Sequence, residues 1–134
     1  MAEINELLMA TYRLSDGEES MSQGCVAVLD VTAEGNAKNP GGEGAGNIAG
    51  VLRDTQLAAG RTGAFQVAGI AKVRVSESVD IGDLLIVADV QGRVRPRGVL
   101  SDSGCGIVGR AISAAGTANS MVKCILGIPE EIIS

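Results

Sequence analysis

Residues 64–76 read Ala-Phe-Gln-Val-Ala-Gly-Ile-Ala-Lys-Val-Arg-Val-Ser, and this stretch decides the fold class. In its second half apolar and polar side chains alternate, with Ala71, Val73 and Val75 set against Lys72, Arg74 and Ser76. A period of two is typical of a β-strand with one buried and one solvated side. The stretch from Ala64 to Val75 therefore predicts a strand in a sheet with one wet face.

Further short runs of the same character lie on both sides of this stretch. Each is rich in apolar or β-branched residues and is bounded by Gly, Pro, Asp or Asn. These runs are 26–31, 48–53, 84–89, 93–95, 107–113 and 120–126. Nothing between Val26 and Ile128 has the pattern of a long helix, and the crossovers of a parallel sheet are missing. We therefore predict an all-β fold, a small antiparallel β-barrel or sandwich of about seven short strands.

The composition limits the chemistry of the chain. Its 134 residues suit one domain with one core, and a hydrophobic content of 46% excludes a disordered tail. The sequence contains no His, which excludes the Ser-His-Asp and Cys-His pairs and the His-ligated zinc sites. We expect a protein that is not an enzyme, with no catalytic, cofactor-binding or metal-binding residues.

Charge and aromatic content argue against two classes of partner. A formal net charge of −5 is repelled by phosphate backbones and anionic lipid. One Phe, one Tyr and no Trp leave few platforms on which bases could stack. The three cysteines, Cys25, Cys105 and Cys124, are odd in number and form no C-x-x-C, which favours a reducing compartment. We expect no nucleic-acid and no membrane partner, and synthesis in a cytoplasm.

Residues 1–24 differ from the rest and are interpreted as an N-terminal arm, followed by a β-domain over residues 25–134. The spacing of Ile4, Leu7 and Leu8 permits a short helix, which is marginal unless it docks on something. A mobile segment with apolar side chains commonly becomes ordered on a partner. The candidate contact residues in this arm are Leu7, Leu8, Met9 and Tyr12.

Two later segments invite functional readings. Residues 104–109, Gly-Cys-Gly-Ile-Val-Gly, match the G-x-G-x-x-G fingerprint of dinucleotide sites, but no βαβ unit surrounds them, so we interpret them as a turn leading into a strand. Arg93, Arg95 and Arg97 occupy alternate positions and predict either a docking stripe or a solvated sheet edge marked by Pro96.

An ordered set of short motifs resembles the capsid cement, or head decoration, proteins of tailed bacteriophages. The motifs are Ile-Ala-Gly-Val-Leu at 48–52, Ala-Ala-Gly at 58–60, Phe-Gln-Val-Ala-Gly-Ile-Ala-Lys-Val at 65–73, Ile-Gly-Asp-Leu-Leu at 81–85, Gly-Arg at 92–93, Ile-Val-Gly-Arg-Ala at 107–111, Ala-Ala-Gly at 114–116 and Val-Lys-Cys-Ile-Leu at 122–126. The resemblance in order and spacing extends over residues 25–127. The loop at 33–46 and the segment 1–24 are longer than the family pattern.

The resemblance implies a β-barrel decoration domain on the outer surface of an icosahedral head. Such a protein clamps neighbouring major capsid subunits against the pressure of packaged DNA, often as a trimer. The partners implied are therefore the major capsid protein and further copies of the chain. Beside the arm, we expect contacts from Asn39 and Pro40 in the glycine-rich loop and from Arg93, Arg95 and Arg97.

Two alternatives remain open at this point. Ile81-Gly82-Asp83-Leu84-Leu85 looks like the turn of biotinyl and lipoyl carrier domains, which need a lysine at an exposed hairpin tip. A β-domain of a phage tail or spike shares the composition but is expected to form elongated fibres.

Overall fold

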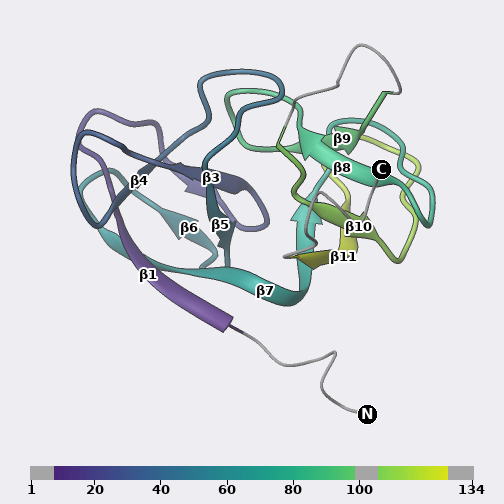
Figure 1. Ribbon diagram of the computed structural model, residues 1–134, viewed down its shortest axis with the longest axis horizontal. Coiled ribbons are helices and arrows are strands. Elements are labelled where there is room, and N and C mark those ends of the chain that lie inside the picture. Colours follow the sequence, from purple (N-terminus) through teal and green to yellow (C-terminus); the bar gives the residue numbers. More distant parts are fainter. Residues whose placement is uncertain (1–7, 99–105, 127–134) are drawn as a thin grey trace.

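The computed structural model describes residues 8–98 and 106–126, and these form strands and connecting loops (Figure 1). The strands are β1 (Leu8–Leu14), β2 (Met21–Ser22), β3 (Val26–Leu29), β4 (Asn36–Lys38), β5 (Ile48–Leu52), β6 (Gln56–Leu57), β7 (Thr62–Arg74), β8 (Leu84–Val87), β9 (Val94–Pro96), β10 (Gly109–Ala111) and β11 (Met121–Leu126). No helix occurs in these residues. The all-β prediction is confirmed, but the described chain has eleven strands rather than about seven. The described part of the chain has no helix long and apolar enough to cross a lipid bilayer.

The main sheet has nine strands in the order β1-β4-β3-β5-β7-β11-β10-β8-β9. Strand β1 also pairs with β7, so β1, β4, β3, β5 and β7 form a closed circuit of pairings. On the other side of the molecule, an isolated bridge between Val75 and Val94 brings the chain after β7 back to β9. Among the pairings of the described residues, only the β1–β4 strand pair and that bridge are parallel. The pairings are thus mostly antiparallel, as predicted, and make partial rings around β7 rather than one simple barrel or sandwich.

Strand β7 changes partners at Gly69. Ala68 is its last residue paired with β1, and Gly69 is its first paired with β11. Gly69 has a φ of 90°, which an L side chain rarely adopts, so glycine suits this position. The preceding Gln66 is 0% exposed and donates from Nε2 to the carbonyls of Ala68 at 3.0 Å and Ile70 at 2.9 Å. The buried amide thus holds the backbone on both sides of Gly69.

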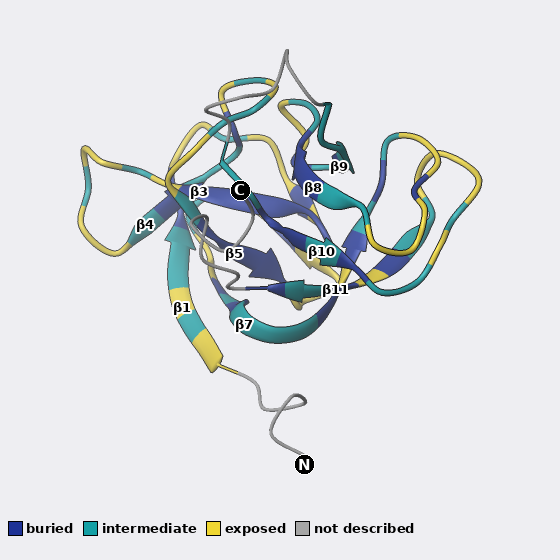
Figure 2. Cartoon of the chain, turned by 45° about the vertical axis from the view of Figure 1, so that its right-hand side comes forward, coloured by how far each residue is buried: buried dark blue, intermediate teal, exposed yellow. Residues whose placement is uncertain are grey.

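The interior consists of two clusters of buried side chains rather than the single core expected. Around the first circuit lie Leu14, Met21, Cys25, Ala27, Ala37, Ala49, Leu52, Leu57 and Phe65. Around β8 to β11 lie Val26, Val51, Ala71, Val73, Val75, Val79, Leu85, Val87, Val94, Val108, Ala111, Val122, Cys124 and Leu126. Neighbouring residues of β3, Val26 and Ala27, belong to different clusters, because successive side chains of a strand face opposite ways. Strands β3, β5 and β7 are therefore shared by both halves, and Figure 2 shows β3 and β5 buried between them.

The N-terminal segment contains a strand that pairs with the rest of the sheet. Residues 8–14 form β1 and pair with β7 from Leu8↔Ala68 to Arg13↔Thr62. Further on, Met21 is buried and pairs with Leu57 of β6. These described residues are therefore joined to the β-domain by backbone pairing. Ile4 and Leu7 lie outside the described residues.

Candidate docking groove

A groove of about 880 Å³ opens where five loops and strand ends meet. Its walls are the β1–β2 connection, the end of β4 with the start of the glycine-rich loop, the end of β7, the β8–β9 turn and the turn before β11. The lining residues are Gly17, Glu18, Glu19, Ser20, Ser22, Cys25, Lys38, Asn39, Pro40, Gly41, Arg74, Val90, Gln91, Arg93 and Asn119. The lining is mostly polar, and a groove of this kind suits hydrogen-bonding ligands or protein segments.

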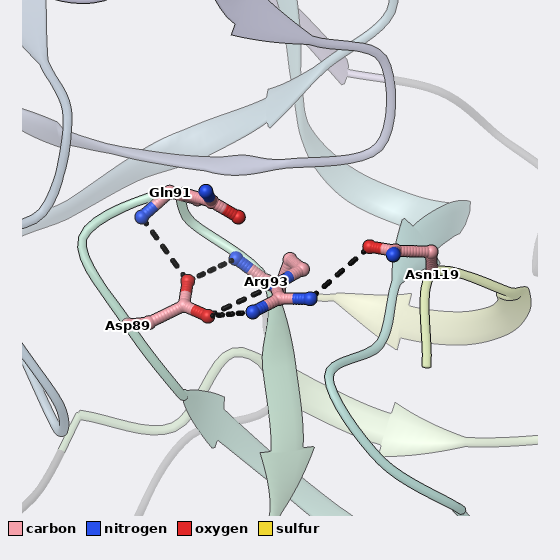
Figure 3. A network of polar contacts seen from close by, with 4 residues as sticks. All are labelled: Asp89, Gln91, Arg93 and Asn119. Atoms are coloured by element: carbon pink, nitrogen blue, oxygen red, sulfur yellow. Dashed lines mark hydrogen bonds and ion pairs between the residues drawn. The ribbon is translucent and has the colours of Figure 1, made fainter. Parts of the chain in front are cut away.

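Arg93 is held on one side of the groove by a network of polar contacts (Figure 3). Asp89 Oδ2 accepts from Arg93 Nε at 2.9 Å and lies 2.7 Å from its Nη2. Asp89 Oδ1 accepts the backbone N–H of Gln91 at 3.1 Å, while Arg93 Nη1 donates to Asn119 Oδ1 at 3.1 Å. The guanidinium therefore links the β8–β9 turn to the turn that precedes β11.

Arg74 fixes the same turn from the end of β7. Its Nη1 donates to the carbonyl oxygen of Asn119 at 3.1 Å, and its Nε and Nη2 donate to the carbonyl oxygen of Gln23 at 3.3 and 3.2 Å. Asn119 has a φ of 69°, a conformation that Asn tolerates better than most residues. Two arginines thus hold this left-handed turn in place.

The opposite wall is fastened by Glu18. Its Oε1 accepts from the backbone N–H of Asn39 at 2.9 Å and from Asn39 Nδ2 at 3.1 Å. Asn39 Nδ2 also donates to the carbonyl of Glu19 at 2.9 Å, and Pro40 is buried. The structure therefore brings Asn39, Pro40 and Arg93 together in one groove, although the sequence analysis placed them in two separate candidate segments. Their contact with a capsid stays a prediction.

The other two arginines of the predicted stripe lie outside this groove. Arg95 Nε donates to Glu43 Oε2 at 2.6 Å, and the backbone N–H of Arg97 donates to the carbonyl of Leu84 at 2.8 Å. Arg93 and Arg95 each have a carboxylate partner, so the stripe carries less free positive charge than its sequence suggests.

The candidate contact residues of the N-terminal segment lie on β1, away from the groove lining. Leu8 is 59% and Met9 is 41% exposed, and both are large apolar side chains. Tyr12 is half-buried and its ring meets Phe65 edge to face, with centroids 5.7 Å apart and an interplanar angle of 70°. Tyr12 therefore packs against the core with one edge of its ring, whereas the side chains of Leu8 and Met9 are exposed. Leu7 lies outside the described residues.

The described thiols are poorly suited to nucleophilic chemistry. Burial raises the pKa of Cys25, and the nearby Arg74 guanidinium opposes that rise only in part. Burial also raises the pKa of Cys124 to about 12. Both thiols are therefore protonated at neutral pH, while the nucleophile is the thiolate. Cys105 lies outside the described residues.

Two motifs from the sequence have structural explanations. Gly109, the last glycine of the G-x-G-x-x-G match, belongs to β10. A Cβ at this position would overlap the carbonyl oxygen of Ile125, so close packing of β10 against β11 explains the glycine without a bound nucleotide. The lysines, Lys38, Lys72 and Lys123, lie in β4, β7 and β11, and none is at the hairpin tip that a carrier domain requires. In the described residues no group of three Cys, Asp or Glu side chains is placed to hold a metal ion.

No protein-family model and no curated protein matches the chain. Among solved structures, the chain is similar to the N base of the head fiber gp8.5 of bacteriophage phi29, with a TM-score of 0.61 and 12% sequence identity. The match covers 91% of this chain and 95% of that one. The two proteins share a fold over nearly their whole lengths.

Sequence reasoning missed the residues that build the groove. Glu18 and Asn119 looked like ordinary loop residues, and Arg74 looked like one member of a wet strand face. Their partners are 21, 26 or more positions away, which no local pattern reports. The one available signal was that Asn119 follows Gly-Thr-Ala in a short turn, where Asn often adopts positive φ.

Proposed function

We propose that this chain is a non-enzymatic structural protein of a bacteriophage head that binds the outer surface of the shell. One observation carries the proposal: the likeness in fold to the N base of a phage head fiber, which extends over 91% of the chain. The sequence resemblance to head decoration proteins also favours a position on the outer surface of a phage head. A net charge of −5 agrees with a position away from packaged DNA.

In its finer form the proposal is a clamp on neighbouring major capsid subunits. A protein that touches two subunits at once adds its binding energy only to the assembled lattice, so it stabilises the shell by mass action. Self-association as a trimer would multiply these contacts. Light scattering at micromolar concentration is expected to give three times the mass of one chain, and a monomer would contradict the trimer.

The exposed end of β1 is the first contact surface we assign. Leu8 and Met9 are both apolar and solvent-exposed, and the outer edge of β1 pairs with β4 only at Arg13 and Leu14. An uncharged strand edge of this kind readily accepts a strand from a partner. The groove with Asn39, Pro40 and Arg93 is the second surface.

The test is binding to phage heads that lack the protein. Purified wild-type protein is expected to sediment with such heads and to appear in electron micrographs as density distributed over the head. A double variant, Leu8→Asp with Met9→Asp, is expected to bind at least tenfold more weakly. Ile81→Asp is the matched control, because Ile81 is 70% exposed but lies in the turn before β8.

Three results would argue against the proposal. Wild-type protein that stays in the supernatant would reject the head as its target. Density confined to the tail would favour the tail or spike alternative. Equal loss of binding in the Ile81→Asp control would reject β1 as the contact surface.

A further inference from the structure

The outward face of β7 and β11 carries three directly opposed residue pairs. They are Ile70↔Ile125, Lys72↔Lys123 and Arg74↔Met121. The intervening pairs Val73↔Val122 and Ala71↔Cys124 face inward and are buried. The period-two pattern predicted from residues 71–76 is confirmed here, and it places two lysines side by side on the wet face.

Lys72 and Lys123 form an unfavourable pair. Directly opposed residues of an antiparallel pair have Cβ atoms about 4.5–5.5 Å apart, and like charges at this distance destabilise the sheet. Both lysines are exposed. In the described part of the chain the ion pairs join Arg13 to Asp16, Arg93 to Asp89 and Arg95 to Glu43, so neither lysine is neutralised by a carboxylate of these residues. The fold therefore retains a local repulsion that one Glu at either position would remove.

A hollow of about 320 Å³ lies beside this pair. It is lined by Gln23, Leu52, Arg53, Ile70, Ala71, Lys72, Met121 and Lys123. Three of these side chains are cationic and none is acidic, in a chain with 16 acidic and 11 basic residues. The guanidinium of Arg53 donates from Nη1 to the neutral amide oxygen of Gln66 at 2.8 Å. The hollow thus combines uncompensated positive charge with the apolar side chains of Leu52, Ile70 and Met121.

We propose that this face docks an extended acidic segment of a protein partner. Carboxylates of that segment would meet Lys72, Lys123 and Arg53, and an apolar side chain between them would fill the hollow. A pair of opposed like charges that does not benefit the fold is typical of a functional surface. Acidic side chains of the partner would complement these positive charges and so supply the specificity. A peptide fits better than a nucleic acid, because no aromatic side chain on which a base could stack lines the hollow. The proposal goes beyond the head location and does not depend on it.

The experiment measures stability and binding in the same variants. The probe is a fluorescein-labelled eight-residue peptide with Glu at alternate positions and Leu between them, and its counterpart carries Gln in place of Glu. Lys72→Glu is expected to raise the melting temperature, because it converts a like-charge pair into an opposite-charge pair. The same change is expected to weaken binding of the acidic peptide at least tenfold. Wild-type affinity for that peptide is expected to fall with added salt, and the Gln peptide is expected not to bind.

Lys38→Glu is the matched control, because Lys38 is also a strand lysine but lies at the end of β4 and lines the other groove. It changes the net charge by the same amount and is expected to leave peptide affinity within twofold of wild type. The proposal is overturned if Lys72→Glu binds the acidic peptide as well as wild type does. It is also overturned if Lys38→Glu weakens binding equally, or if a short DNA duplex binds more tightly than the peptide. Wild-type protein that does not bind the acidic peptide but still sediments with heads would reject this proposal alone.

Discussion

The side-chain amide of Gln66 donates a hydrogen bond to the carbonyl of Ile70, four residues further along the same strand. A second bond from the same Nε2 reaches Ala68, and Arg53 Nη1 donates to the Oε1 of Gln66. The hydrogen bonds of this buried amide therefore replace backbone hydrogen bonds between strands at the point where β7 stops pairing with β1 and β5 and begins pairing with β11.

Replacing Gln66 by Met keeps the side chain's approximate volume but removes all three hydrogen bonds. We expect the free energy of unfolding to fall by about 1–3 kcal/mol, because the carbonyls of Ala68 and Ile70 lose their partner in a buried site. Urea denaturation measures the change. Gln56→Met, on an exposed position of β6, is the control and is expected to change stability by less than about 0.5 kcal/mol. Equal effects of the two substitutions would reject a special role for Gln66.

Gly109→Ala tests the close contact between β10 and β11. The added Cβ would overlap the Ile125 carbonyl oxygen and lie 2.5 Å from Cys124 Sγ, so the strands must separate. We expect a loss of about 2–3 kcal/mol in thermal or urea unfolding. Gly41→Ala is the control, because nothing lies within 4 Å of a Cβ there and its φ is not in the left-handed region. A stable Gly109→Ala variant would contradict the packing described for β10.

Acid stability is expected to depend on Asp30. A hydrogen bond from Ser15 Oγ at 2.5 Å, followed by bonds from the Thr32 hydroxyl at 2.6 Å and its backbone N–H at 3.0 Å, lowers the pKa of Asp30 to about 2. An unfolded Asp titrates near 3.9. The folded state therefore binds fewer protons than the unfolded state between these values. This contribution to stability is complete above about pH 4 and is lost as the pH falls toward 2.

Ser15→Ala removes the largest cause of that shift. We expect the Asp30 pKa to rise toward its ordinary value and the melting temperature to lose part of its dependence on pH between about 4 and 2. NMR titration of the Asp30 carboxyl carbon measures the first change directly. An Asp30 pKa near 2 in the variant would show that the Ser15 hydroxyl is not the main cause.

Tyr12→Leu separates the role of this residue in the core from any role in binding. Loss of the edge-to-face contact with Phe65 is expected to lower stability by about 0.5–1.5 kcal/mol. Thr11→Ser, on the exposed side of the same strand, is expected to have a much smaller effect. If Tyr12→Leu is as stable as wild type, the ring contributes to a surface and not to the core.

Long patterned strands were predictable from the sequence, and short or competing ones were not. The alternation of residues 71–76 identified the C-terminal half of β7, because one face of that strand is wet. The two-residue strands β2 and β6 and the three-residue β4 are too short to show a period. β1 was not among the predicted strands, because its pairing with the distant β7 leaves no local signal in the sequence.

The candidate groove was predictable in its parts but not as a site. Asn39 and Pro40 were singled out in one segment and Arg93 in another, and more than 50 residues of sequence separate Pro40 from Arg93. Glu18, Arg74 and Asn119, which hold its walls, had no local signal, because each acts through a partner in another segment. Likewise, Lys72 and Lys123 are opposed because of the register between β7 and β11. That register cannot be inferred from the sequence of either strand alone.

Because β7 pairs with β1, β5 and β11 and contributes to both buried clusters, we expect the two halves of the molecule to unfold together. Loss of order anywhere along this strand removes partners from β1 and β5 as well as from β11. Unfolding should therefore be a single cooperative transition, and the amides of β7 should be among the slowest in the chain to exchange with deuterium. A force applied to one half of the molecule is therefore transmitted to the other half along the continuous backbone of β7.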